Sequence, residues 1–593
     1  MSSKVKISFG RVFWPSLVSG IVLMILFFVF LVILIASLTG GKKPYSIKNN
    51  TVLHLTLSAP IDEVSDNGFD PNTFQLKSTN GLSELLYGFE RAADDDRVAG
   101  VFLDLNAVGC GFARATEIRN AIKQFKASGK FVVAYLKGEA VGLKQYYVAS
   151  AADEIYGFPS SMFDFGGLGT EVMFYKGLFD KLAVEIQVVR GSNNDFKSAV
   201  EPFFLEQMSD SSRVQIQRYL TSIWEDVTLT VGNERGIDID KLNYFADSTI
   251  MRRLSDAAEH NLIDEVMYKD EIMGLLAEKV NVKSVNDLRL ESFEKYAQNK
   301  FNSNQKIVGG KKPNIAIVVA EGTVSRQGDG LSAKKVTKQL RKVREDEKIK
   351  AVVLRVNSPG GSALASDEIW REVMLTKAEK PVIVSMGDLA ASGGYFISAP
   401  GDKIFAQSST ITGSIGVFGM IPYTGDMFEN KLGITFDRVG TNARSVLSLN
   451  KRLSEEEFAI VQEEVDFIYD QFLDRVVEGR GMTKEQVNEI ARGRVWTGKD
   501  ALEIGLIDEI GGIKEAVDYA GEIANIPADD VLVQLYPKRK VEPWMEILEA
   551  LDDKDEESSQ TIIPEELIEY YTVLRTLEER TGIQARLPFD IKF

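Results

Sequence analysis

Short apolar runs alternate with amphipathic stretches along most of the chain, and this order of elements occurs twice. In the first half, the run 52–57 (VLHLTL) is followed by a helix-like stretch and by a second apolar run that ends at Asn106. In the second half, the apolar run that starts at Asn314 is followed by an amphipathic stretch and by a run that ends at Asn357. Strands that alternate with helices predict a parallel sheet with crossover helices. We therefore expect an α/β domain that is present twice.

The correspondence between the halves continues downstream. Residues 131–150 match residues 381–398, and residues 255–266 match residues 498–510. An internal duplication explains this agreement most simply. The resulting organisation has five parts: a tail and anchor (1–48), the first repeat (49–268), a polar join (269–312), the second repeat (313–540), and an acidic linker with a C-terminal amphipathic helix (541–593).

One apolar run near the N-terminus is long enough to cross a bilayer. Residues 17–38 contain no charged side chain. A cleavable signal peptide has a shorter apolar region of about 7–15 residues, so the run favours an uncleaved transmembrane anchor. Basic residues lie on both sides of the run, and charge alone therefore leaves its orientation open.

The composition excludes several classes of partner and catalytic site. A formal net charge of −17 gives no support for binding to a phosphate backbone, so we expect no nucleic-acid partner. Cys110 is the single cysteine, and His54 and His260 are the two histidines. These counts exclude an intramolecular disulfide, thiolate metal clusters and most histidine-based triads. We expect no metal and no organic cofactor, and a catalytic mechanism that avoids histidine.

The informative positions are those at which one repeat alone carries a reactive side chain. Ser392 follows a strand in the small-residue turn GDLAASGG, whereas the first repeat has Leu143 at this position. A strand-to-helix turn of small residues leaves a serine hydroxyl reachable. Ser392 is therefore a candidate nucleophile, and the first repeat lacks a counterpart.

The first repeat in turn carries a candidate base. Lys197 lies among apolar residues where the second repeat has Arg444. A desolvated ammonium can lose its proton near neutrality, whereas a guanidinium stays charged. Serine paired with lysine is a known alternative to serine paired with histidine. In addition, a Gly-Gly turn in VNSPGGS and the residue after the nucleophile predict an oxyanion hole from the N–H groups of Gly361 and Gly393. A composite site between the repeats follows.

Several separated motifs resemble those of the signal peptide peptidase A (protease IV) family in its long, two-repeat form. They are NSPGG at 357–361, ASGGY at 391–395, TGSIG at 412–416 and KSAVEPF at 197–203. The resemblance implies tandem ClpP/crotonase-like domains after an N-terminal transmembrane helix. It also implies a serine peptidase in which Ser392 is the nucleophile, Lys197 is the general base and Ser414 orients Lys197.

The same resemblance implies a biological setting. Family members degrade signal peptides that remain in the membrane after their release, and they prefer apolar segments. They assemble as homotetramers. This implies a single-pass protein of a bacterial cytoplasmic membrane with its catalytic part on the outer, periplasmic side.

Two other interpretations of the residues stay open. The first is a crotonase-like acyl-CoA enzyme, which usually needs a carboxylate base. The second is a catalytically silent membrane scaffold, in which Lys197 and Ser392 lie beyond hydrogen-bond reach. We further expect Cys110 to be a small buried residue, and His54 and His260 to have no ligand role. The GGLG run at 166–169 is the counterpart of TGSIG and not a phosphate-binding loop.

Overall fold

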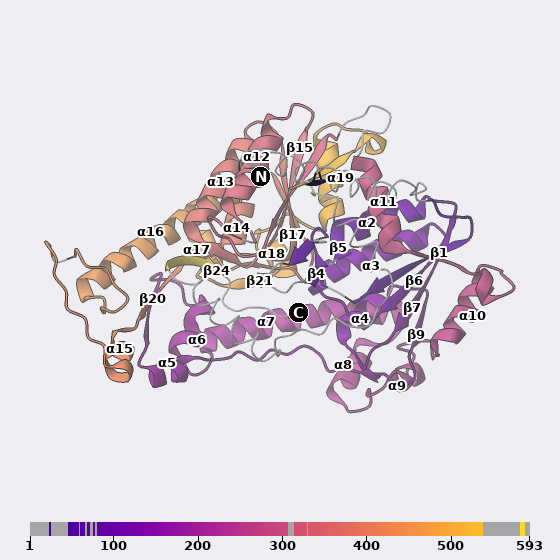
Figure 1. The fold of residues 1–593 in the computed structure, drawn as a ribbon, viewed down its shortest axis with the longest axis horizontal. Helices are drawn as coiled ribbons and strands as arrows, with labels where there is room; N and C mark the ends of the chain where they lie inside the picture. Colours follow the sequence, from indigo (N-terminus) through magenta and orange to yellow (C-terminus); the bar gives the residue numbers. More distant parts are fainter. Residues whose placement is uncertain are drawn as a thin grey trace, which may run out of the picture. The chain divides into compact units, whose positions relative to one another are not determined.

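The computed structural model describes residues 23–24, 46–58, 60–65, 68–70, 75–77, 80–305, 313–328, 330–442, 444–537 and 582–586 (Figure 1). Nearly all of them belong to one compact unit, which consists of Lys48–Asn67, Lys77–Lys538 and Ile563–Phe593. The anchor expected at 17–38 lies outside the described residues except for residues 23–24. Within the described ranges, no helix is long and apolar enough to cross a membrane.

Six parallel strands form the sheet of the first repeat. Their order across the sheet is β12 (Glu265–Val266), β9 (Glu154–Gly157), β7 (Phe131–Leu136), β6 (Val98–Leu105), β1 (Thr51–Leu57) and β13 (Arg289–Ser292). Strands β6 and β7 are almost wholly buried, because helices cover both faces of the sheet. The flanking helices are α2 (Leu82–Ala93), α3 (Phe112–Ala127), α4 (Leu143–Ala149), α10 (Lys269–Lys279) and α11 (Phe293–Gln305).

The sheet of the second repeat has the same order of corresponding strands. These are β22 (Glu509–Ile510), β18 (Lys403–Ala406), β17 (Val382–Ala391), β15 (Ala351–Ser358), β14 (Ile315–Glu321) and β23 (Val533–Tyr536). The C-terminal end of β17 also pairs with β19 (Ile411–Gly413). Strand β19 pairs in turn with the antiparallel strand β21 (Val495–Thr497). The surrounding helices are α12 (Ala333–Glu345), α13 (Ala363–Lys377), α14 (Gly393–Ser398), α16 (Glu455–Arg480), α17 (Lys484–Ile490), α18 (Gly498–Glu503) and α19 (Ile513–Ile523).

Matching hydrogen bonds show which positions of the two repeats correspond to each other. The hydroxyl of Tyr146 donates to the carbonyl of Leu262 at 2.8 Å, and that of Tyr395 donates to the carbonyl of Leu506 at 2.8 Å. Leu143 precedes Tyr146 by the same number of residues as Ser392 precedes Tyr395. The two positions compared in the sequence therefore correspond in the structure as well.

The stretch 269–312, where the sequence predicts a polar join, contains secondary structure over its described part. Helix α10 packs through Ile272 and Leu276 on the core of the first sheet, and β13 pairs with β1 as its edge strand. The polar composition of this stretch predicts a join, but an edge strand such as RLES (Arg289–Ser292) is only partly buried and needs few apolar residues. Residues 269–305 are thus part of the packed first repeat.

A third, antiparallel sheet joins the repeats. Its order is β11 (Glu185–Arg190), β20 (Phe418–Tyr423), β24 (Gly582–Arg586) and β16 (Gly360–Ser362). Strand β11 comes from the first repeat and precedes the loop that carries Lys197, whereas β16 and β20 come from the second repeat. The amphipathic helix expected in 541–593 lies outside the described residues, among which only 582–586 belong to that segment.

A fully buried arginine also connects the repeats. Arg355 on β15 donates from Nε to Glu63 at 2.8 Å and from Nη2 to Glu117 at 2.6 Å. Both carboxylates belong to the first repeat. Burial raises the pKa of Glu117 to about 6, although the charge of Arg355 opposes this shift. The strand that leads into the Gly-Gly turn is therefore held to the first repeat by a buried ionic network.

Replacing this arginine should destabilise the protein strongly. Arg355→Met leaves two buried carboxylates without their cation and should lower the free energy of unfolding by about 3–5 kcal/mol. Urea denaturation followed by tryptophan fluorescence measures the change. Arg341→Met is the matched control, because the Arg341 side chain is 58% exposed and its partner Glu372 keeps a second ion pair, with Arg344. Loss of an ion pair made by such an exposed arginine should cost about 0–1 kcal/mol. Equal stability of the two variants would contradict the role given to Arg355.

Candidate active site

Ser392 lies on a strained turn between β17 and α14. Its φ of 55° and ψ of −116° are unfavourable for a residue with a side chain. Its N–H donates to the carbonyl of Gly413 at 2.8 Å, and its carbonyl accepts from the N–H of Phe396 at 2.8 Å. A Cβ at Gly394 would lie 2.7 Å from the carbonyl oxygen of Ser358, so the turn requires a glycine there. Backbone bonds and close packing thus hold the serine in place.

Lys197 reaches this serine from the first repeat. Its Nζ lies 2.8 Å from Oγ of Ser392, 3.0 Å from Oγ of Ser414 and 3.0 Å from the carbonyl oxygen of Ser414. The structure therefore brings together three residues that the sequence predicts as a site, from two repeats and across about 200 positions of the chain. The condition for the silent-scaffold interpretation, a separation of Lys197 and Ser392 beyond hydrogen-bond reach, is not met.

The environment of Lys197 favours its neutral form. The side chain is fully buried, at 0% exposure. Burial lowers the pKa of the Lys197 ammonium well below its ordinary value, because the charged form loses its hydration. Among the described residues, no carboxylate forms an ion pair with its Nζ that would oppose this shift. A neutral amine at this place can accept the proton of the Ser392 hydroxyl.

The loop that carries Lys197 is docked on the second repeat by residues that the sequence did not single out. The N–H of Phe196 donates to the carbonyl of Arg492 at 3.0 Å, and Nδ2 of Asn194 donates to the carbonyl of Val417 at 3.0 Å. A Cβ at Gly493 would lie 2.6 Å from Cβ of Lys197. Gly493 therefore makes room for the lysine. No local pattern could identify it, because the contact joins residues far apart in the chain.

Ser414 lies where it can orient the lysine. Its N–H donates to the carbonyl of Arg494 at 2.7 Å, and its hydroxyl donates to the carbonyl of Gly493 at 3.3 Å. This leaves the Ser414 oxygen lone pairs directed at Lys197, with Nζ at 3.0 Å. The geometry fits a positioning residue for the amine.

Removing the Ser414 hydroxyl should moderately slow catalysis by the Ser392–Lys197 pair. Ser414→Ala should lower kcat about tenfold, which corresponds to one hydrogen bond of ordinary strength, and should leave KM unchanged. Steady-state kinetics separate the two constants. A purely structural role would instead lower the amount of folded protein without changing kcat per active site, as counted by active-site titration.

Gly393 directly follows the nucleophile, and Gly361 belongs to the Gly-Gly turn of the second repeat. Gly361 is on β16 with a φ of 155°, and a Cβ there would lie 2.2 Å from the carbonyl oxygen of Val324. Gly393 is the first residue of α14, so no carbonyl of its own helix can accept from its N–H. β16 packs against α14. The two glycines thus lie on elements that pack together next to Ser392, and the assignment of their N–H groups to an oxyanion hole stays a prediction.

The corresponding place in the first repeat is filled by its own side chains. Nζ of Lys144 donates to the carbonyl of Cys110 at 2.7 Å, and Gln145 accepts from the N–H of Gly142 at 2.7 Å. The turn is also relaxed, because Ser392 has a positive φ whereas its counterpart Leu143, the first residue of α4, does not. A pocket of about 290 Å³ remains there, lined mainly by apolar side chains that include Leu143. The position has lost both the hydroxyl and the strained turn.

Cys110, His54 and His260 lie in surroundings that indicate structural and not catalytic roles. Cys110 is buried, and burial raises the pKa of its thiol, which disfavours a thiolate nucleophile. Nε2 of His54 lies 3.2 Å from Asp104, and the ring stacks on Phe102. His260 packs on Phe245. Over the described part of the chain, no group of three or more His, Cys, Asp or Glu side chains is arranged to hold a metal ion.

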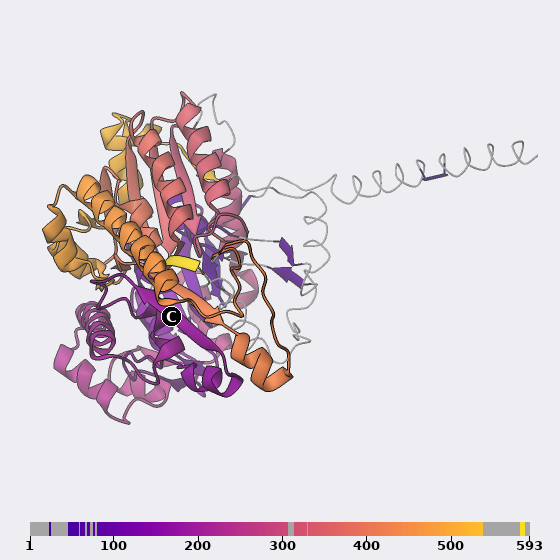
Figure 2. The same ribbon diagram turned by 90° about the vertical axis from the view of Figure 1, so that its left-hand side faces the viewer.

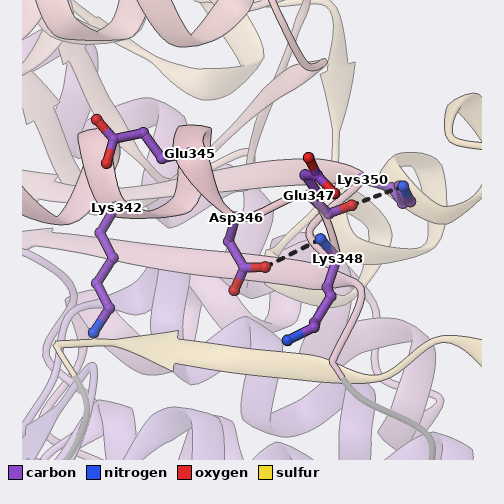
Figure 3. A pocket seen from close by; sticks show the side chains of 6 residues that line it. All are labelled: Lys342, Glu345, Asp346, Glu347, Lys348 and Lys350. Carbon is purple, nitrogen blue, oxygen red and sulfur yellow. Dashed lines mark hydrogen bonds between the residues drawn. The ribbon is translucent and has the colours of Figure 1, made fainter.

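A second hollow lies on the surface at the end of α12. Figure 3 shows its charged lining, which is formed by Lys342, Glu345, Asp346, Glu347, Lys348 and Lys350. The N–H of Lys348 donates to Asp346 at 3.0 Å, and Nζ of Lys350 donates to the carbonyl of Glu347 at 2.7 Å. The charges are mixed, and Asp346 and Lys350 bond to the backbone of the segment itself. This hollow is a solvated turn and contains none of the predicted site residues.

A serine on a strained turn, in contact with a buried lysine, is an arrangement typical of serine hydrolases that use an amine as base. Comparisons with known proteins agree with this class. The model of peptidase family S49 matches residues 124–283 and 374–526, and the Clp protease model matches residues 317–411. The chain belongs to peptidase family S49 and is a serine peptidase.

Relatives match over most of their length. Protease 4 of Haemophilus influenzae is 35% identical over 537 residues, which cover 86% of this chain and 85% of the relative. The chloroplastic serine protease SPPA of Arabidopsis thaliana is 34% identical and covers 81% of this chain and 70% of its own. Protease 4 of Salmonella typhi is 36% identical and covers 75% of this chain and 72% of its own.

Proposed function

We propose that the protein is a membrane-bound endopeptidase that uses Lys197 as the base for Ser392 and degrades apolar peptides, in particular cleaved signal peptides. The observation that supports this most is the 2.8 Å contact between Nζ of a fully buried Lys197 and Oγ of Ser392. The family motifs at 197–203, 357–361, 391–395 and 412–416 support the substrate class and a ClpP/crotonase-like fold for both repeats.

The proposed reaction begins with proton transfer from Ser392 to neutral Lys197. The Ser392 oxygen attacks the scissile carbonyl, and the N–H groups of Gly361 and Gly393 stabilise the oxyanion. The Lys197 ammonium then protonates the leaving amine, and the C–N bond breaks to give the acyl-enzyme. Water attacks the ester with Lys197 again as base, which releases the carboxylate product and restores Ser392.

The membrane location rests on the apolar run 17–38. We place the catalytic repeats on the outer side of a bacterial cytoplasmic membrane, as the family resemblance implies. Fractionation of cells that express the full chain, followed by protease treatment of spheroplasts, tests both points. Protection of the repeats in intact spheroplasts would contradict the proposed orientation.

We further propose a homo-oligomer, with four subunits as the family resemblance implies. Within the chain, β11 of the first repeat follows α5 (Lys176–Leu182) and pairs with β20. The corresponding stretch of the second repeat, residues 434–439, follows α15 (Gly425–Leu432) and is exposed instead of paired. Val439 is 93% and Leu447 is 82% exposed. A second copy that repeats the β11–β20 pairing would cover this apolar segment.

The test of the function compares two substrates. The detergent-solubilised full chain should hydrolyse an apolar signal-peptide mimic, and it should cleave a polar peptide of equal length more slowly. The same preparation should show no hydratase or isomerase activity on acyl-CoA thioesters. Thioester turnover without peptide hydrolysis would favour the acyl-CoA interpretation, and absence of both activities would favour a scaffold.

A further inference from the structure

A buried glutamine of the first repeat contacts the chain on both sides of Lys197. Gln215 lies on α7 (Asp210–Arg235) and is 1% exposed. Its Nε2 donates to the carbonyl of Phe196 at 3.1 Å and to Oγ of Ser198 at 2.9 Å. These two residues are the direct neighbours of Lys197 in the chain. One amide group therefore holds the backbone before the lysine and the side chain after it.

The same glutamine also binds the segment that supports Ser414. Its Oε1 accepts from the N–H of Val495 at 3.2 Å. The preceding residue, Arg494, accepts at its carbonyl from the N–H of Ser414 at 2.7 Å. One position earlier, Gly493 makes room for Lys197 and accepts from the hydroxyl of Ser414. The glutamine thus joins the loop that carries the base to the segment that holds the serine expected to orient it.

The helix that carries this glutamine is itself attached to the second repeat. Helix α7 packs against β21, and Figure 2 shows the first repeat in indigo to magenta and the second in pink to yellow. Arg218 pairs with Asp500 at 2.6 Å, and the hydroxyl oxygens of Ser222 and Thr497 lie 3.0 Å apart. Positions 215, 218 and 222 follow at spacings of three and four, so they share one face of the helix. This face is therefore bound to the second repeat at three successive points.

The place of the loop decides both the reach and the proton affinity of the amine. Nζ of Lys197 lies 2.8 Å from Oγ of Ser392, and a small displacement of a reacting group lowers the rate strongly. Burial alone lowers the pKa of Lys197, since Asp195 and Arg492 beside the loop pair with each other. An outward movement of the loop would admit water and restore the ammonium. The hydrogen bonds of Gln215 oppose this movement, because breaking them leaves buried polar groups without partners.

We propose that Gln215 is a positioning residue for the reaction. By bridging Phe196 and Ser198 to Val495, its side chain holds Lys197 within hydrogen-bonding distance of the nucleophile and keeps water away from the amine. Gln215 touches none of the reacting atoms and acts through the lysine. The kinetic consequence rests on the proposed function, whereas the effect on the loop does not.

Gln215→Met tests the kinetic part, because methionine fills the buried space but makes none of the three hydrogen bonds. On an apolar reporter peptide, kcat per titrated active site should fall about tenfold or more, with KM unchanged. The rise of kcat/KM with pH should also move to higher pH, because a better hydrated ammonium holds its proton more strongly. Gln217→Met is the matched control and should keep the native values. Gln217 lies on the same helix, is exposed and bonds to Thr221 at 3.2 Å.

Gln215→Glu is the second variant, and it decides if Gln215→Met gives no folded protein. Glutamate keeps the shape of the side chain and the acceptor for Val495, but an ionised carboxylate cannot donate to the carbonyl of Phe196. Its negative charge also favours the ammonium form of Lys197, so the pH profile should again move to higher pH. Native kcat and a native pH profile in the folded Gln215 variants would overturn the proposal.

Hydrogen exchange separates this inference from the proposed function. In the detergent-solubilised full chain, mass spectrometry should show faster amide exchange over residues 194–200 in Gln215→Met than in the native protein or in Gln217→Met. Faster exchange there, without any hydrolysis by the native chain, would retain the anchoring of the loop and reject the peptidase proposal. Hydrolysis by Gln215→Met with native kinetics and native exchange would reject the positioning role and retain the peptidase proposal.

Discussion

Ser392→Ala should abolish peptide hydrolysis, with kcat/KM lowered by at least about 10⁴-fold. The expected loss is large because the proposed reaction has no other nucleophile at the site. The first repeat offers Leu143 at the matching position, and the Cys110 thiol is buried with a raised pKa. Initial rates on an apolar reporter peptide, with circular dichroism to confirm folding, measure the effect.

Cys110→Ala is the control for this prediction. This substitution removes the single thiol of the chain, which lies in the first repeat's counterpart of the Gly-Gly turn. Activity should be retained within about threefold. Loss of activity in Cys110→Ala with retention in Ser392→Ala would reverse the assignment of the nucleophile.

Lys197→Met should reduce hydrolysis to a similar extent, because a methionine fills the buried space but accepts no proton. Lys197→Arg should also be inactive, since a guanidinium stays charged at accessible pH. In the native protein, kcat/KM should rise with pH through the lowered pKa of Lys197 and level off above it, because the neutral amine is the active form. A rate that is independent of pH from acid to alkaline conditions would contradict this mechanism.

Lys144→Met is the matched control for Lys197→Met. Burial also lowers the pKa of Lys144, but its Nζ donates to the carbonyl of Cys110 in the first repeat and does not contact Ser392. Its removal should leave the pH profile of kcat/KM unchanged. A shifted profile in Lys144→Met would point to a base other than Lys197.

The duplicated fold and the central pair of residues were predictable from the sequence for one physical reason. Parallel strands buried on both faces appear as short apolar runs, and these runs occur twice in the same order. Alignment of the two copies then isolates the positions where chemistry differs, and Ser392 and Lys197 are two of them. Their 2.8 Å contact agrees with the composite site that this comparison predicts.

Other features depend on contacts that leave no local pattern. Gly493 makes room for Lys197, and Arg355 meets Glu63 and Glu117, only because the two repeats pack together. The strand β13 is polar because it lies at a sheet edge. β24 binds through backbone groups, which every sequence possesses, so the segment 582–586 gave no signal of its partner. Long-range packing, and not propensity, decides these features.

The most direct test of the composite site is to locate the covalent intermediate. The full chain is mixed with an apolar peptide ester, quenched in acid during turnover, digested and analysed by mass spectrometry. The mechanism predicts an acyl group on the fragment that contains Ser392, and its absence in Ser392→Ala and Lys197→Met. An acyl group on another residue, or continued turnover with no acyl group on Ser392, would contradict the account.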